Sequence, residues 1–237
     1  VARAVLGAAV APFFWLGVVS AARPLPPELG RPGTYEASVR VTDRQGVLLR
    51  EVRANDATRA RWISLDDAGD DVARAFVAAE DKRFYQHKGI DERGLIRAMV
   101  ANLARPGRPQ GGSTITQQVV KLGLVGTERT AKRKLKEAMW AHELEKHYTK
   151  NQILEHYLNA VYLGNGAYGI EAAAELYFGK AASALDFAEG ALLAGLIRNP
   201  TGYDPFRYPA RSKTRRLEAL KRLQVIGKIS ALDVIAF

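Results

Sequence analysis

The stretch TKNQILEHYLNAVYLG, Thr149–Gly164, decides the fold class of this chain. Thr149 followed three residues later by Gln152 is a capping-box pattern, which marks the start of a helix. Gly164 is a typical stop. Between them, apolar residues recur at helical spacing: Leu154, Tyr157, Leu158, Val161 and Tyr162. The stretch therefore predicts an amphipathic helix that packs into a core, within a mainly α fold.

Similar signals on both sides extend the helical pattern from about Asp66 onward. Caps and stops mark the other expected helices. These are a helix ending near Glu80 with Val72, Phe76 and Val77 on one face; one capped by Asp91 that carries Ile96, Met99, Val100 and Leu103 and stops at Pro106-Gly107; two with capping boxes, Thr114 with Gln117 and Asp186 with Glu189; and a basic helix from about Ala210 to Val225.

The only convincing β signal precedes the helices. Residues 34–54 alternate in polarity in places and contain a turn signal at residues 43–46, so a small hairpin is expected there. Upstream, AVLGAAVAPFFWLGVVSAA (Ala4–Ala22) has no charge, and as a helix it would span about 28 Å, close to the hydrocarbon thickness of a bilayer. A cleavable signal peptide with Val19-Ser20-Ala21 at its cleavage site is the alternative, although the stretch is long for one.

We therefore predict three parts: a transmembrane anchor at 1–22, a juxtamembrane spacer and hairpin at 23–60, and a mainly helical domain at 61–237. The chain has 237 residues, no cysteine and a net charge of +10. Disulfides and thiolate metal sites are thereby excluded. A basic surface attracts nucleic acid, anionic lipid headgroups or a phosphorylated substrate. The expected anchor and the sparse aromatic residues in the basic stretches argue against nucleic acid.

Four segments could carry chemistry. In the first, Glu80 and Asp81 stand at the end of an apolar helix, where desolvation suits a general acid or base. A solvated charge cluster is the alternative. In the second, the glycines and hydroxyls of residues 110–118, followed by Lys121, could hold an anion at a helix N-terminus. A flexible loop before a well-capped helix is the alternative.

The third and fourth segments are weaker by themselves. In the third, residues 129–145, Arg133 and Glu137 are four apart and can pair on a solvated face. In the fourth, residues 150–159, Glu155 is equally explained as a buried carboxylate that anchors backbone. Other patterns fail: Gly164–Gly169 matches GxGxxG but follows a helix, the histidines lack zinc-ligand spacing, and no Ser-x-x-Lys of a penicillin-reactive site occurs.

Taken in order, the segments resemble the motif set of the peptidoglycan glycosyltransferases, glycosyltransferase family 51. The family occurs as monofunctional enzymes and as the first catalytic domain of class A penicillin-binding proteins, and the hairpin is similar to the penicillin-binding protein 1C branch. The match covers about residues 65–205. The motifs are complete at Glu80, Asp81, Phe84, His87 and Gly89; at Gly111–Gln118 with Lys121; at Arg133, Lys134 and Glu137; at Lys150–Asn159; and in similar form at Ala194–Pro200. Leu122 stands where an asparagine is common in the family, directly after Lys121 of the second motif.

The resemblance implies a lysozyme-like helical lobe with a membrane-dipping jaw, and polymerisation of lipid II into β-1,4-linked glycan with release of undecaprenyl pyrophosphate. Glu80 would be the catalytic base, and Glu137 would be the second acidic residue of the site, placed to stabilise the donor end. Substrate would be bound by Asp81, Phe84, His87, Gly111, Ser113, Thr114, Gln117, Gln118, Lys121, Arg129, Arg133, Lys134 and Glu155.

Many members use a divalent cation such as magnesium or manganese, although no motif here specifies one, and no organic cofactor is expected. Expected partners are lipid II, the nascent strand, the membrane, and a transpeptidase domain or cell-wall synthesis proteins. The expected location is the bacterial inner membrane, single-pass, with the catalytic domain on the periplasmic face. Two rivals remain: a lysozyme-like hydrolase, which needs no phosphate-binding cations, and a non-catalytic membrane-surface module.

Overall fold

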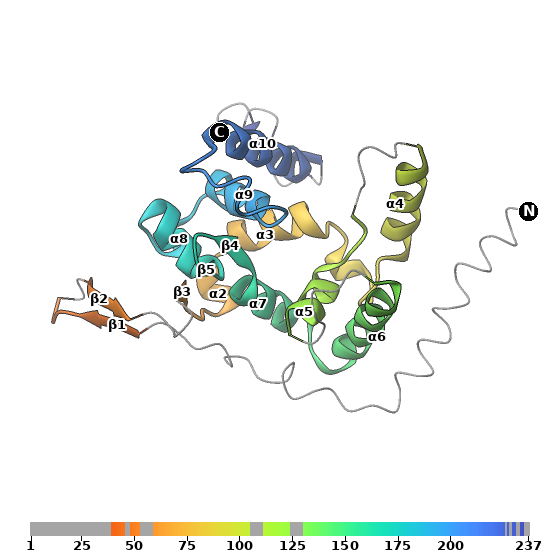
Figure 1. Cartoon of the computed structure of the whole chain (residues 1–237), viewed down its shortest axis with the longest axis horizontal. Helices are drawn as coiled ribbons and strands as arrows, with labels where there is room; N and C mark the ends of the chain where they lie inside the picture. The colour runs from red at the N-terminus through yellow and green to blue at the C-terminus, as the bar shows by residue number, and fades with distance from the viewer. Residues whose placement is uncertain are drawn as a thin grey trace, which may run out of the picture. The chain divides into compact units, whose positions relative to one another are not determined.

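The computed structural model describes residues 39–45, 48–52, 59–104, 111–123 and 130–225, with a few positions beyond. These residues are mainly helical (Figure 1). They divide into two compact units. The first unit contains the described residues between 84 and 153, and the second contains those between 39 and 83 and from 154 onward.

The predicted hairpin is confirmed. Strands β1 (Val39–Thr42) and β2 (Leu48–Val52) pair antiparallel. In the turn, the amide of Gln45 donates to a carboxylate oxygen of Asp43 at 2.9 Å, a local side-chain bond typical of Asp in turns. The predicted anchor, Ala4–Ala22, lies outside the described residues. In the part that is described, no helix combines the length and the apolar character needed to cross a membrane.

Helices α3 (Asp70–Glu80), α9 (Phe187–Leu196) and α10 (Pro209–Val225) pack together in the second unit (Figure 1). The predicted helix end at Glu80, the capping box at Asp186 and Glu189, and the basic helix are all confirmed. Gly190 permits the close contact of α9 with α3, because a Cβ there would lie 3.3 Å from the side chain of Ala75. The short α2 (Leu65–Ala68) precedes α3.

A three-stranded sheet in the second unit was not predicted. Its order is β3 (Arg59–Ala60), β5 (Ala167–Tyr168) and β4 (Tyr162–Gly164). Helix α7 (Lys150–Ala160) consequently ends before Tyr162, which the sequence pattern had placed in the helix. The GxGxxG string, Gly164–Gly169, follows α7 and needs glycine for backbone reasons. Gly169 has φ +79°, and a Cβ there would lie 2.6 Å from the carbonyl oxygen of Asn159. Helix α8 (Ile170–Phe178) and the 3-10 turn η2 (Ala182–Ala184) follow.

The first unit contains the 3-10 turn η1 (Phe84–Gln86) and helices α4 (Glu92–Ala104), α5 (Ile115–Gly123) and α6 (Ala131–His147). The predicted cap of α4 is confirmed, since a carboxylate oxygen of Asp91 accepts from the amide of Gly94 at 3.0 Å. Helices α5 and α6 lie side by side (Figure 1). The outer face of α4 is apolar and exposed, and its members are Ile96, Met99, Val100 and Leu103.

Candidate active site

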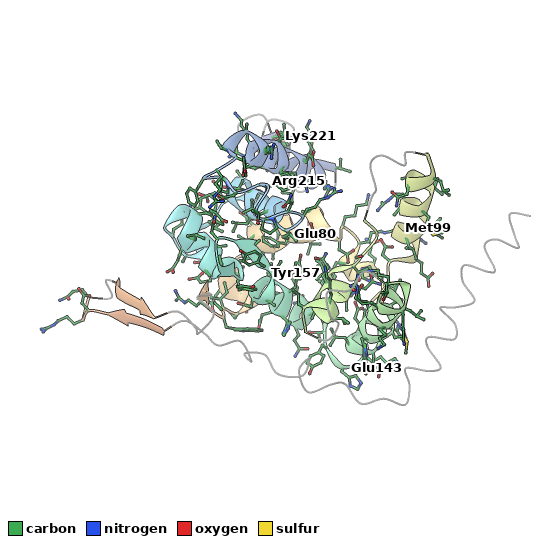
Figure 2. All side chains as sticks on the ribbon, viewed as in Figure 1. Glu80, Met99, Glu143, Tyr157, Arg215 and Lys221 are labelled. Carbon is green, nitrogen blue, oxygen red and sulfur yellow. The ribbon has the colours of Figure 1, made fainter. Side chains whose placement is uncertain are left out.

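Glu80 is the last residue of α3, and Asp81 is the cap that follows it (Figure 2). Glu80 is half-buried, whereas Asp81 is buried, and its amide donates to the carbonyl of Val77 at 2.9 Å. The apolar face of α3, which includes Phe76, therefore sets both carboxylates at the edge of a hydrophobic core. A carboxylate at such an edge is suited to proton transfer.

Tyr157 of α7 is a neighbour of these carboxylates that the sequence pattern assigned only to the core (Figure 2). It is fully buried and packs edge-on against Phe76, with ring centroids 6.4 Å apart. Burial raises the pKa of Tyr157 well above its usual value, and the negative charges of Glu80 and Asp81 raise it further. The phenol thus stays protonated beside two carboxylates. In the sequence, the position of Tyr157 within the fourth motif, between Glu155 and Asn159, is the signal that could have pointed to this site.

Lys134 is the centre of a polar cluster in the first unit. Its ammonium nitrogen lies 2.7 Å from the hydroxyl of Ser113, 3.4 Å from the side-chain oxygen of Gln117 and 2.8 Å from a carboxylate oxygen of Glu137. Glu137 is only 2% exposed and also pairs with Arg133, one turn earlier on α6. The cluster therefore joins the second predicted motif, on α5 and the loop before it, to the third, on α6.

The cations outnumber the carboxylate in this cluster. Burial lowers the pKa of Lys134 to about 8, with the charges of Arg133 and Lys121 contributing further. Both Arg133 and Lys134 pair with the single carboxylate of Glu137. The Nε of Arg133 is buried without a hydrogen-bond partner among the described residues. An excess of closely spaced positive charge of this kind favours an anionic ligand.

The remaining predicted residues of the second motif differ in role. Thr114 is buried; its hydroxyl donates to the carbonyl of Gly89 at 2.6 Å and accepts from the amide of Gln117 at 3.1 Å. The side chain of Gln117 caps the amide of Thr114 in return, which confirms the capping box. Gly111 is exposed, and no atom lies within 4 Å of a Cβ placed there. Gln118 is half-buried on α5, and Arg129 lies outside the described residues.

Gly89 of the first motif is required by packing. It has φ +82°, and a Cβ there would lie 2.6 Å from the carbonyl oxygen of Ala141 in α6. We expect Gly89→Ala to lower the free energy of unfolding by about 2–3 kcal/mol, since both the left-handed backbone and the backbone clash are costly. Urea unfolding measures this. Gly111→Ala, in open space, is the matched control, and equal stability of the two variants would contradict the packing argument.

Phe84 and His87 lie in the first unit and contact each other edge-on, with centroids 6.2 Å apart. Phe84 is fully buried, whereas His87 is half-buried. Glu155 is in the second unit and anchors backbone: one carboxylate oxygen accepts from the amide of Leu65 at 2.9 Å, and the other accepts from the indole N–H of Trp62 at 3.4 Å. These contacts support the structural interpretation of Glu155 rather than substrate contact.

In the described residues, no group of three or more His, Asp or Glu side chains could hold a metal ion. The structure brings together the following predicted residues in the first unit: Ser113, Gln117, Lys121, Arg133, Lys134 and Glu137. Glu80, Asp81 and Glu155 belong to the second unit.

The sequence model of the family described as transglycosylase matches residues 45–224. Penicillin-binding protein 1A of Aquifex aeolicus (strain VF5) is 48% identical over 170 residues, which are 71% of this chain and 23% of that protein. Penicillin-binding protein 1F of Bacillus subtilis (strain 168) is 39% identical over 199 residues, which are 84% of this chain and 28% of that protein. The chain thus spans about a quarter of the length of these curated relatives.

A crystal structure of penicillin-binding protein 1A from Haemophilus influenzae aligns with 84% of this chain and 20% of its own, at 23% identity and a TM-score of 0.45. The family match covers most of the chain and includes all the motifs from Glu80 to Pro200. This chain therefore belongs to the transglycosylase family, the peptidoglycan glycosyltransferases of bacterial cell-wall synthesis.

Proposed function

We propose that the chain polymerises lipid II into β-1,4-linked glycan strands with inversion at the anomeric carbon. Glu80 removes the proton from the 4-hydroxyl of the acceptor sugar. The freed oxygen bonds to C1 of the donor sugar while the bond from C1 to the pyrophosphate oxygen breaks. The proton resides on Glu80, and undecaprenyl pyrophosphate carries away the electron pair. The half-buried position of Glu80 at the end of α3 supports this role.

The cluster around Lys134 is the structural feature that best supports this reaction. A departing pyrophosphate concentrates negative charge, and preorganised cations and hydroxyl donors stabilise it in the transition state. Lys134, with Arg133 and Lys121 close to it, supplies the cations, and Ser113 supplies a hydroxyl 2.7 Å from the ammonium. Glu137 holds Arg133 and Lys134 in place and can balance positive charge that develops on the donor sugar.

A lysozyme-like hydrolase is the rival, because it would also use two carboxylates. Cleavage of a neutral glycosidic bond has no need of the Lys134 cluster. The test is incubation of the chain with labelled lipid II, followed by gel separation of glycan products. We expect polymer and released undecaprenyl pyrophosphate. Shortening of added glycan strands without polymer would favour the hydrolase, and binding of lipid II without turnover would favour the membrane-surface module.

The same proposal includes the cellular setting. Lipid II carries a long lipid, so we propose a membrane-bound enzyme of the bacterial inner membrane with its catalytic domain on the periplasmic face. A single anchor within residues 1–22 and a divalent cation such as magnesium or manganese remain predictions. So do the lysozyme-like fold of the helical part and a partner transpeptidase domain. The exposed apolar face of α4, which includes Leu103 at 81% exposure, is compatible with a lipid surface.

The lowered pKa of Lys134 predicts an alkaline limit to activity. Because the charged form of Lys134 stabilises the leaving group, kcat/KM for lipid II should fall as the pH rises through about 8, where Lys134 loses its proton. Well above that pH, the fall should be about tenfold per pH unit. A pH profile of initial rates measures this. Lys134→Arg keeps a cation at every pH, so its alkaline limb should move to higher pH. An unmoved limb would exclude Lys134 as its source.

A further inference from the structure

The first unit contains an ion pair that takes no part in the proposed reaction. The ammonium of Lys150, at the start of α7, lies 2.7 Å from a carboxylate oxygen of Glu145, near the end of α6. The Glu145 side chain is 6% exposed and that of Lys150 is 20% exposed. Replacing such a buried pair by neutral side chains is often harmless to stability, so its presence calls for another explanation.

Glu145 connects this pair to α5. The same carboxylate oxygen accepts a hydrogen bond from the hydroxyl of Thr116 at 2.5 Å, and Thr116 is fully buried. Thr116 lies in the first turn of α5, beside Gln117, whose side-chain oxygen contacts Lys134. Through this bond, Glu145 holds the helix turn that carries part of the Lys134 cluster.

Lys150 connects the pair to the first motif. Its ammonium nitrogen lies 4.4 Å from the centroid of the Phe84 ring, within the range of a cation–π contact. It also lies 3.5 Å from the Nδ1 of His87. One residue further along α7, Asn151 is within 3.4 Å of the hydroxyl of Tyr85. The start of α7 thus contacts three residues of the Phe84–His87 segment.

We propose that Glu145, Lys150 and Thr116 form a positioning network, which fixes the Phe84–His87 segment relative to the first turn of α5. This inference rests on the proposed function, because it assigns the network to the reaction at the Lys134 cluster. The three residues take no part in bond making or breaking. They hold two parts of the substrate site in register, and a misplacement of about 1 Å can cost about 100-fold in rate.

The double variant Glu145→Gln/Lys150→Met tests this role. It removes both charges, so no buried charge is left without a partner, and we expect a thermal midpoint within a few degrees of the parent. Turnover of lipid II at saturation should nevertheless fall by about 100-fold, with a smaller change in KM. A double variant with parental stability and parental turnover would overturn the proposal, because the pair would then be merely structural.

Glu143, which Figure 2 labels, pairs with Lys146 on α6 and provides a matched control. Their side chains are 2.8 Å apart, Glu143 is as buried as Glu145, and Glu143 also contacts His147 on the same helix. Glu143→Gln/Lys146→Met should keep parental turnover. An equal loss of turnover in both double variants would overturn the proposal, because any paired change on α6 would then suffice.

A second readout is independent of activity. The ring current of Phe84 should shift the proton resonances at the end of the Lys150 side chain upfield in NMR spectra, and Glu145→Gln should partly abolish this shift. An unchanged shift would overturn the network itself. If the parent chain made no polymer from lipid II while the shift responded as expected, the proposed function would fail and the network would stand.

Discussion

Glu80→Gln is expected to reduce polymerisation of lipid II by at least about 1,000-fold, because an amide cannot accept the proton of the acceptor hydroxyl. Glutamine has nearly the same shape, so the end of α3 and its contacts with the core should persist. The free energy of unfolding should accordingly stay close to that of the parent. Initial rates with labelled lipid II, together with urea unfolding, separate a loss of chemistry from a loss of fold.

The control is Glu218→Gln, an exposed glutamate of the same unit that pairs with Arg215 on α10. Although the Arg215 side chain is only 11% exposed, Glu218 is 51% exposed, so the change should leave the rate unaltered and lower the free energy of unfolding by less than about 1 kcal/mol. Equal polymerisation by Glu80→Gln and the parent would exclude Glu80 as the base. A rate loss that tracks a loss of stability would instead assign Glu80 to the fold.

The helices could be predicted because their signals are local. Thr114 with Gln117 and Asp186 with Glu189 form the capping bonds that their spacing indicates. The sheet of β3, β5 and β4 could not be predicted, because its strands have two or three residues each and Arg59 pairs with Ala167 across a long sequence separation. The apolar helical pattern in the sequence therefore includes Tyr162, but pairing within this sheet places Tyr162 in β4 instead.

The site shows the same division between local and long-range causes. The pairing of Arg133 with Glu137 follows from their spacing on one helix, and the structure confirms it. The contacts of Lys134 with Ser113 and of Glu145 with Thr116 join different helices. The motifs assigned both Lys134 and Ser113 to the substrate site, whereas no sequence pattern pointed to the contact between Glu145 and Thr116. Contacts between side chains on different helices are thus the part of the site that the sequence does not reveal.

Glu137→Gln should lower the free energy of unfolding by about 3–5 kcal/mol, because it leaves two cations without their buried carboxylate. Glu137 is 2% exposed and is shared by Arg133 and Lys134, so the loss affects both at once. Asp70→Asn is the contrasting variant: its pair with Arg74 is 2.6 Å long but largely exposed. That variant should cost less than about 1 kcal/mol in the same urea experiment.

The pH profile then separates stability from chemistry in this variant. Without the negative charge of Glu137, the ammonium of Lys134 is harder to keep charged, so its pKa should fall below the present value of about 8. The alkaline limb of lipid II polymerisation should therefore move to lower pH. Adding Lys134→Met to Glu137→Gln removes one unpaired cation and should recover part of the stability, but it also removes a stabiliser of the pyrophosphate. Stability that recovers while turnover stays low would place both residues in the reaction, whereas parallel recovery of the two would confine them to the fold.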